Sequence, residues 1–250
     1  KKMNRLTYRK YNSLLLIAFL LSLTGMRTDT NYLGNVKKVF DVMNDAVVND
    51  KVCYLKYAIT TNLNSKDAKG NLIVNTGTFE MITSKSQSRL YSKDMIILKD
   101  QKNTFAILPA RKVIYWSDAV PSKKGEHLYD QLSTLQDSIF KNVKKQECIE
   151  VKDKEYTKII NIDLNEKMSS FLGIKSATYF INDITQRLSK VIVLYQPGNQ
   201  YTRLEYDFKE TDLDYKKMNM NVPVRELVFD NGQKFQVAYQ GFQLKDNRKK

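Results

Sequence analysis

Apolar and polar residues alternate with a period of two over most of the chain beyond residue 50, and this pattern limits the fold more than any other feature. Successive side chains of a β-strand point to opposite faces of a sheet, so each such segment buries one face. Asp230-Asn231-Gly232 is a hairpin signal, because a tight turn between strands needs residues that tolerate a positive φ. The expected strands are 53–59, 71–82, 89–98, 104–108, 112–116, 156–162, 177–182, 188–196, 201–209, 224–229 and 235–244.

Two segments keep a helical period instead. Residues 35–49 place Val36, Phe40 and Met43 on one apolar stripe, and residues 127–143 repeat this spacing. A short helix or turn is expected at 165–172, ending at Gly173. The sequence therefore predicts an α+β fold, in which a strongly curved antiparallel sheet is covered by two or three helices.

The first residues have the pattern of an export signal. Residues 1–10 carry five basic residues and no acid, and the apolar run 14–23 follows them. As a helix this run rises about 15 Å, half of the roughly 30 Å of a bilayer core. We expect a signal peptide at 1–28, cleaved or retained as an inner-membrane tether, one domain at 30–244 and a basic tail at 245–250. The expected location is the periplasm.

The net charge of +14 indicates an acidic partner. Without residues 1–29, which hold six basic residues and one acid, about +9 remains. An exported protein seldom meets nucleic acid, so an anionic membrane surface or an acidic polypeptide is the better hypothesis. The alternative is that the charge serves solubility alone.

The residues needed for most catalytic chemistry are absent from the sequence. His127 is the single histidine, and the chain has no H-E-x-x-H, C-x-x-C, G-x-S-x-G or Gly-rich phosphate motif. We therefore expect a protein that is not an enzyme, with no cofactor and no metal site. Cys53 and Cys148 either form a disulfide or remain free, with Cys53 buried and Cys148 at an edge.

Aromatic residues, at 11% of the chain, are the positive signal for function. Many alternate with polar residues on the expected strands. Where helices cover the apolar face of such a sheet incompletely, an apolar groove large enough for a lipid remains. The alternative is an ordinary core without a cavity.

The order of these elements resembles the periplasmic lipoprotein-carrier superfamily, whose members are LolA-like or LolB-like. The run 100–113, DQKNTFAILPARKV, is similar to that family's turn, aromatic strand, Pro bend and following strand. Gly77-Thr78-Phe79-Glu80-Met81 resembles its early Gly-led strand, and the hairpins over 177–209 resemble its C-terminal half. The resemblance implies an unclosed half-barrel that holds acyl chains under a helical lid. The chain departs from the family at Thr83-Ser84-Lys85, where carriers have a basic residue and then Pro, so neither Lys85 nor Arg89 is assigned the cargo-gating role.

Two hypotheses of function follow. The first is a non-enzymatic exported carrier that holds an acyl chain, a lipoprotein or another amphipathic ligand. The second is a structural subunit of an envelope-spanning assembly, which uses the same fold to bind an envelope protein and fills its interior with its own side chains. Strand alternation gives the candidate ligand-binding residues as Leu55, Tyr57, Phe79, Met81, Phe105, Ile107, Tyr115 and Trp116.

Overall fold

The computed structural model describes residues 31–119, 139–231 and 233–248. The expected signal peptide, most of the expected helix at 127–143 and the last residues of the basic tail lie outside these ranges. Among the described residues, no helix is long and apolar enough to cross a membrane.

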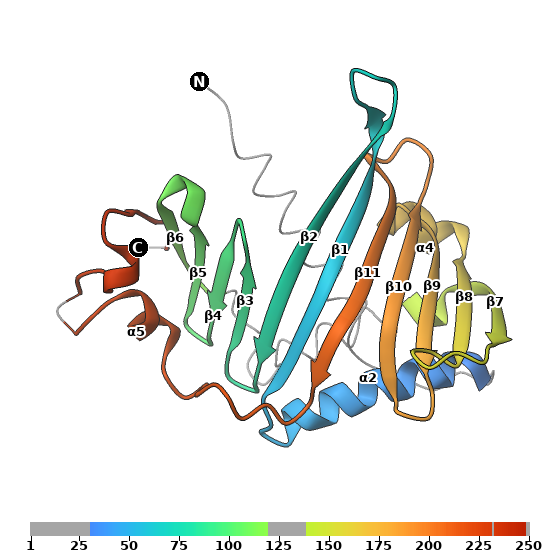
Figure 1. Ribbon diagram of the computed structural model, residues 1–250, viewed down its shortest axis with the longest axis horizontal. Coiled ribbons are helices and arrows are strands. Elements are labelled where there is room, and N and C mark those ends of the chain that lie inside the picture. Colours follow the sequence, from blue (N-terminus) through green and yellow to red (C-terminus); the bar gives the residue numbers. More distant parts are fainter. Residues whose placement is uncertain (1–30, 120–138, 232, 249–250) are drawn as a thin grey trace. The chain divides into compact units, whose positions relative to one another are not determined.

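The strands form one 12-stranded sheet with the order β12-β6-β5-β4-β3-β2-β1-β11-β10-β9-β8-β7 (Figure 1). The printed strand pairs are antiparallel, apart from the parallel pair of β12 and β6. Because β12 and β7 are the two ends of this order, the sheet does not close into a barrel. The unclosed antiparallel sheet expected from the sequence is thus confirmed.

The chain divides into two compact units. Three long strands contribute residues to both: β1 (Cys53–Lys66), β2 (Leu72–Thr83) and β11 (Tyr201–Asp212). The first unit also holds β7 (Val143–Glu150), β8 (Lys158–Leu164), α4 (Glu166–Leu172), β9 (Ile174–Asn182), β10 (Arg187–Tyr195) and most of α2 (Asn31–Val48). The second holds β3 (Ser88–Ser92), β4 (Ile96–Lys99), β5 (Asn103–Leu108), η1 (Pro109–Arg111), β6 (Val113–Asp118), α5 (Val224–Val228), η2 (Val237–Tyr239) and β12 (Gln243–Asp246).

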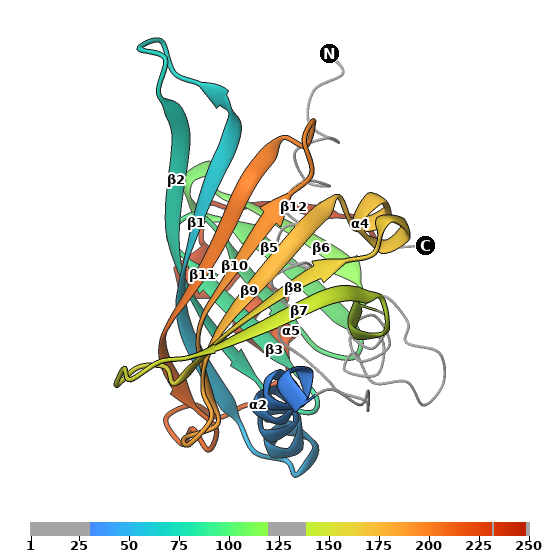
Figure 2. The ribbon, with the colours of Figure 1, turned by 90° about the vertical axis from the view of Figure 1, so that its right-hand side faces the viewer.

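In the first unit the expected helix stripe is buried as predicted. Val36, Val39 and Phe40 of α2 are at most 1% exposed, and the Phe40 ring meets the ring of Tyr179 edge-on at 6.4 Å. Tyr179 belongs to β9, which pairs with β8 and β10 (Figure 2). The apolar face of these strands therefore forms a core with the helix stripe.

The short helix α4 also follows from its sequence. The side chain of Asn165 accepts a hydrogen bond from the backbone N–H of Met168, which is an N-cap contact. Gly173 ends the helix with φ 68°, a left-handed conformation that glycine adopts without steric cost. The predicted bounds of 165–172 differ from the observed ones by one residue at the start.

In the second unit, Pro109 separates β5 from β6 as expected. It opens the 3₁₀ turn η1, and Lys112 ends this turn with φ 49°. The expected strand 89–98 is divided into β3 and β4, because the Ser92 hydroxyl accepts the Met95 N–H and donates to the Met95 carbonyl. This local turn reverses the chain inside what the sequence presents as one run.

The prediction for the C-terminal segment was wrong. Residues 224–228 form α5 instead of a strand, and little of 235–244 is extended, since η2 and then β12 replace the expected strand. Val224, Leu227 and Val228 have helical spacing and pack on the sheet, whereas the expected hairpin is reduced to one bridge between Phe229 and Phe235. Burial of these three side chains against the sheet outweighs the strand propensity of the valines.

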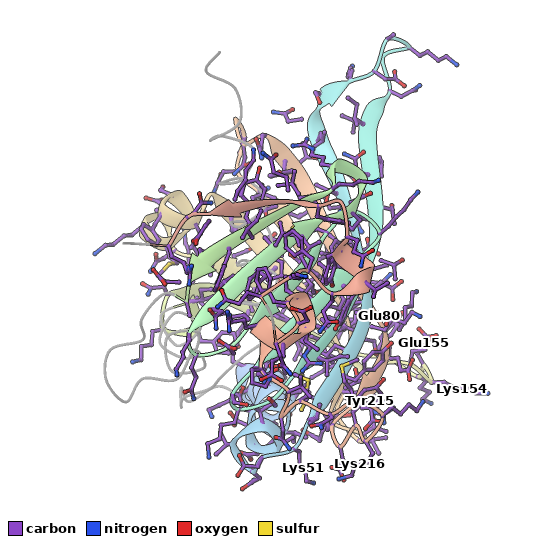
Figure 3. All side chains as sticks on the ribbon, turned by 90° about the vertical axis from the view of Figure 1, so that its left-hand side faces the viewer. Lys51, Glu80, Lys154, Glu155, Tyr215 and Lys216 are labelled. Carbon is purple, nitrogen blue, oxygen red and sulfur yellow. The ribbon has the colours of Figure 1, made fainter. Side chains whose placement is uncertain are left out.

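This C-terminal segment seals one face of strands β3–β6, which we call the α5 face (Figure 3). Phe229 lies 5.9 Å from the ring of Phe105 and 5.3 Å from the rings of Trp116 and Phe235. The guanidinium of Arg248 lies 3.4 Å from the Trp116 ring centroid. The buried members of the cluster are Leu98, Phe105, Ile107, Ile114, Trp116, Val224, Val228 and Phe229.

The connecting segment before α5 is tied to β3 by a buried arginine. Arg89 is 3% exposed, and its Nη2 donates to the backbone carbonyls of Asn219 at 3.3 Å and Val222 at 3.2 Å. Gln87 accepts a further bond from Arg89 and itself donates to the Val222 carbonyl at 2.9 Å. Tyr215, labelled in Figure 3, stacks on Tyr54 in the same connection.

Phe229→Ala is expected to lower the free energy of unfolding by about 3–5 kcal/mol, because it removes a buried aromatic ring from the cluster. Val237→Ala is the control, since Val237 is 80% exposed and its loss should cost less than about 0.5 kcal/mol. Urea denaturation measures both. Equal stability of the two variants would contradict the packing of the α5 face.

Arg89→Met is expected to loosen residues 219–222, because the Asn219 carbonyl loses its donor and the Val222 carbonyl keeps only the one from Gln87. Hydrogen exchange read by mass spectrometry should show that the substitution speeds exchange in this segment, relative to the wild type, more than it does in β4 and β5. Arg111→Met, at an exposed position, is the control. Unchanged protection of 219–222 in the Arg89 variant would show that the arginine does not hold the segment.

Candidate functional site

The strand register divides the predicted ligand residues between the two faces of the sheet. Residues directly opposite each other in an antiparallel pair project to the same face. Phe105 lies opposite Trp116, and Ile107 lies opposite Ile114. Ala106, between them in sequence, lies opposite Tyr115 and therefore belongs to the other face.

Phe105, Ile107 and Trp116 lie on the α5 face. Phe105 and Ile107 are fully buried, and Trp116 is 7% exposed. The Trp116 indole N–H donates to the Asn103 side chain at 3.0 Å, and the ring stacks on Phe105 at 5.2 Å. The chain's own C-terminal segment thus occupies the space in front of these residues.

The remaining predicted residues share the opposite face, which we call the Lys99 face. Tyr57 stacks on Phe79 at 5.7 Å and contacts Phe208 at 5.8 Å. Leu55 precedes Tyr57 by two residues on β1 and points the same way. Met81 and Tyr115 reach this face from β2 and β6. The structure brings together five of the predicted residues: Leu55, Tyr57, Phe79, Met81 and Tyr115.

On the Lys99 face the register builds an apolar row across the strands. Met81 of β2 lies opposite Leu90, which lies opposite Ile97 of β4. The row goes on through Ala106 of β5 to Tyr115 of β6. Met81, Leu90 and Ala106 are buried, whereas Ile97 and Tyr115 are half-buried. Neighbours in such a row are close enough for one elongated apolar molecule to contact several of them.

A polar row runs beside the apolar row on the same face, two residues away along each strand. Ser88 lies opposite Thr83 on one side and opposite Lys99 on the other, and Thr104 lies between Lys99 and Ser117. The row thus places hydroxyl groups on both sides of one amine. Lys99 is not among the residues expected from the sequence, although its position two residues after Ile97 on one strand places both on the same face.

The ammonium group of Lys99 is half-buried, and this burial lowers its pKa. No described carboxylate forms an ion pair with it. The register puts no acidic residue of β3–β6 on the Lys99 face, since Asp118 lies opposite Asn103 on the α5 face. Lys245 of β12 adds a second cation, 5.6 Å from the Tyr115 ring centroid. This face is therefore cationic as well as apolar.

No disulfide joins Cys53 and Cys148 in the structure. Cys53 is buried at the start of β1, and burial, with a smaller contribution from Asp212, raises the pKa of its thiol to about 12. Cys148 lies half-buried on the edge strand β7, and burial raises its pKa as well. Neither thiol has the lowered pKa of a reactive nucleophile.

The part of the chain that the structure describes offers no cluster of metal-ligating residues. The ion pairs that it forms are ordinary ones, such as Lys56 with Glu80 at 3.2 Å. The Lys99 face is therefore the candidate site, and its chemistry suits non-covalent binding.

No protein-family profile matches the chain, and no curated protein is detectably similar to it in sequence. Solved structures are similar at low identity. An uncharacterised conserved protein from Thermus thermophilus is 8% identical with a TM-score of 0.42, over 82% of this chain and 98% of that one.

Two further solved structures carry the family name that the sequence suggested or a related one. A LolA superfamily protein from Nitrosomonas europaea is 8% identical with a TM-score of 0.31, over 72% of this chain and 93% of that one. An outer membrane lipoprotein-sorting protein domain from Vibrio parahaemolyticus is 10% identical with a TM-score of 0.31, over 72% and 94%.

Proposed function

We propose that the chain is a non-enzymatic binding or carrier protein that holds the acyl chain of an amphipathic ligand against the Lys99 face. The observation that carries the proposal is the apolar row from Met81 to Tyr115, which lies on a face whose one charged side chain on β3–β6 is the cation Lys99. An anionic amphiphile matches such a face in both its apolar and its charged part.

The energies are sufficient for useful binding. Each buried methylene contributes about 0.8 kcal/mol, so a chain of about 16 carbons gains roughly 12 kcal/mol when fully buried. Association and ordering cost on the order of 4–15 kcal/mol. Full burial at the low end of that cost leaves about 8 kcal/mol, which corresponds to micromolar affinity. Such an affinity suits a carrier that must also release its ligand.

Export to the periplasm belongs to the same proposal. It rests on the basic and apolar pattern of residues 1–23 and on the net charge of +14. A basic protein in the envelope is attracted to anionic membrane surfaces, where acyl-bearing lipids and lipoproteins are found. These are the cargo and the surface that we assign to it.

The alternative, a structural subunit of an envelope-spanning assembly, draws support from the α5 face. There the chain fills one apolar face with its own side chains, as that hypothesis expects of its interior. The two functions separate by what co-purifies with the protein: lipid for a carrier, or an envelope protein that crosslinks to it for a subunit.

Ile97→Asn is expected to weaken binding of the fluorescent probe N-phenyl-1-naphthylamine about tenfold, because it places an amide in the middle of the apolar row. Val237→Asn, at an 80% exposed position, is the matched control and should bind as the wild type does. Fluorescence titration gives both affinities, and a thermal melt confirms that both variants are folded.

Absence of probe binding by the wild type, together with native mass spectra free of lipid, would overturn the carrier proposal. An unchanged affinity of the folded Ile97 variant would place the site elsewhere.

A further inference from the structure

We infer that Lys99 and its flanking hydroxyl groups bind a single carboxylate headgroup, so that the ligand is a long-chain fatty acid. The inference rests on the proposed function and names the class of ligand. It is carried by the polar row Thr83, Ser88, Lys99, Thr104 and Ser117, which borders the apolar row on the same face.

The environment of Lys99 differs from that of other shielded lysines in the described chain. The side chain of Lys158, 19% exposed, pairs with Asp183 at 2.7 Å, and that of Lys37, 26% exposed, pairs with Asp41 at 2.7 Å. A charge removed from water is costly unless an opposite charge compensates it. Lys99 lacks that compensation within the described residues, so a bound anion would supply it.

Hydroxyl groups stand on both sides of this amine. Ser88 and Thr104 lie directly opposite Lys99 on the neighbouring strands. Within the described residues neither hydroxyl has a hydrogen-bond partner of its own, whereas the Ser117 hydroxyl donates to the Thr104 carbonyl at 3.5 Å. A carboxylate has two oxygens, each of which accepts more than one bond, and one amine with two hydroxyls satisfies it.

The distance between the rows sets the orientation of the ligand. Residues two apart on a strand are separated by about 7 Å. A carboxylate at Lys99 therefore places its first methylene groups beside Ile97 and leads the chain toward the apolar row. The polar row offers one cation, Lys99, because Lys245 lies three strands away on β12, beside Tyr115. One positive charge at the headgroup matches one negative charge better than the two charges of a phosphate monoester.

The test compares headgroups on one chain length by displacement of N-phenyl-1-naphthylamine. Palmitic acid, hexadecanol and lysophosphatidic acid are titrated into the wild type, Lys99→Met and Lys102→Met. Lys102 is an exposed lysine in the turn between β4 and β5, so its variant carries the same change in net charge. Lys99→Arg tests rescue by a different cation.

The wild type is expected to bind palmitic acid about tenfold more tightly than hexadecanol, a difference of about 1.4 kcal/mol. Lys99→Met should lose this preference while its affinity for hexadecanol is kept or improved, and Lys102→Met should retain it. Lys99→Arg should restore part of the preference. Because the charge of Lys99 opposes folding in its half-buried place, Lys99→Met should melt no lower than the wild type.

The outcomes separate this inference from the proposal beneath it. Failure of all three lipids to displace the probe would overturn the proposed function. Equal binding of acid and alcohol by the wild type, or a preference that survives in Lys99→Met, would overturn the carboxylate site alone. Tighter binding of lysophosphatidic acid than of palmitic acid would show a phosphate site in place of the carboxylate site.

Discussion

The antiparallel register of strands β2–β6 is the constraint on which the rest of the second unit depends. It decides for every residue of these strands which face its side chain joins. A shift by one residue would exchange Phe105 with Ala106 and Leu98 with Lys99, and so exchange the two faces. The sealed aromatic cluster and the candidate site are therefore two results of the same set of backbone hydrogen bonds.

The two faces have different surroundings because the C-terminal segment covers one of them. Phe229 and Val228 pack against the α5 face, and Arg89 holds the connection that leads to them. The largest aromatic side chains of β5 and β6 belong to this cluster. On these strands the Lys99 face carries smaller and more mixed side chains, in which an apolar row is bordered by hydroxyl groups and one amine. Such a mixed surface suits an amphiphile better than a purely apolar surface does.

Much of the fold was predictable because its signals are local. The stripe of α2, the caps of α4 and the bend at Pro109 each depend on residues within a few positions of one another. The candidate site was predictable only in part. Leu55, Tyr57, Phe79, Met81 and Tyr115 share a face, whereas Phe105, Ile107 and Trp116 lie on the other, because alternation within a strand does not say which parity of one strand meets which parity of the next.

The sequence by itself determined an antiparallel sheet with amphipathic helices, since period and turn residues act along the chain. That the sheet stays unclosed is a property of the strand order. Tertiary structure alone decided that 224–228 is helical, because the face of β3–β6 that this segment covers is formed by distant residues. It also decided that Lys99 stands between Ser88 and Thr104, a relation set by hydrogen bonds between strands. Contacts of this kind depend on how segments are paired in space, which their separate sequences do not encode.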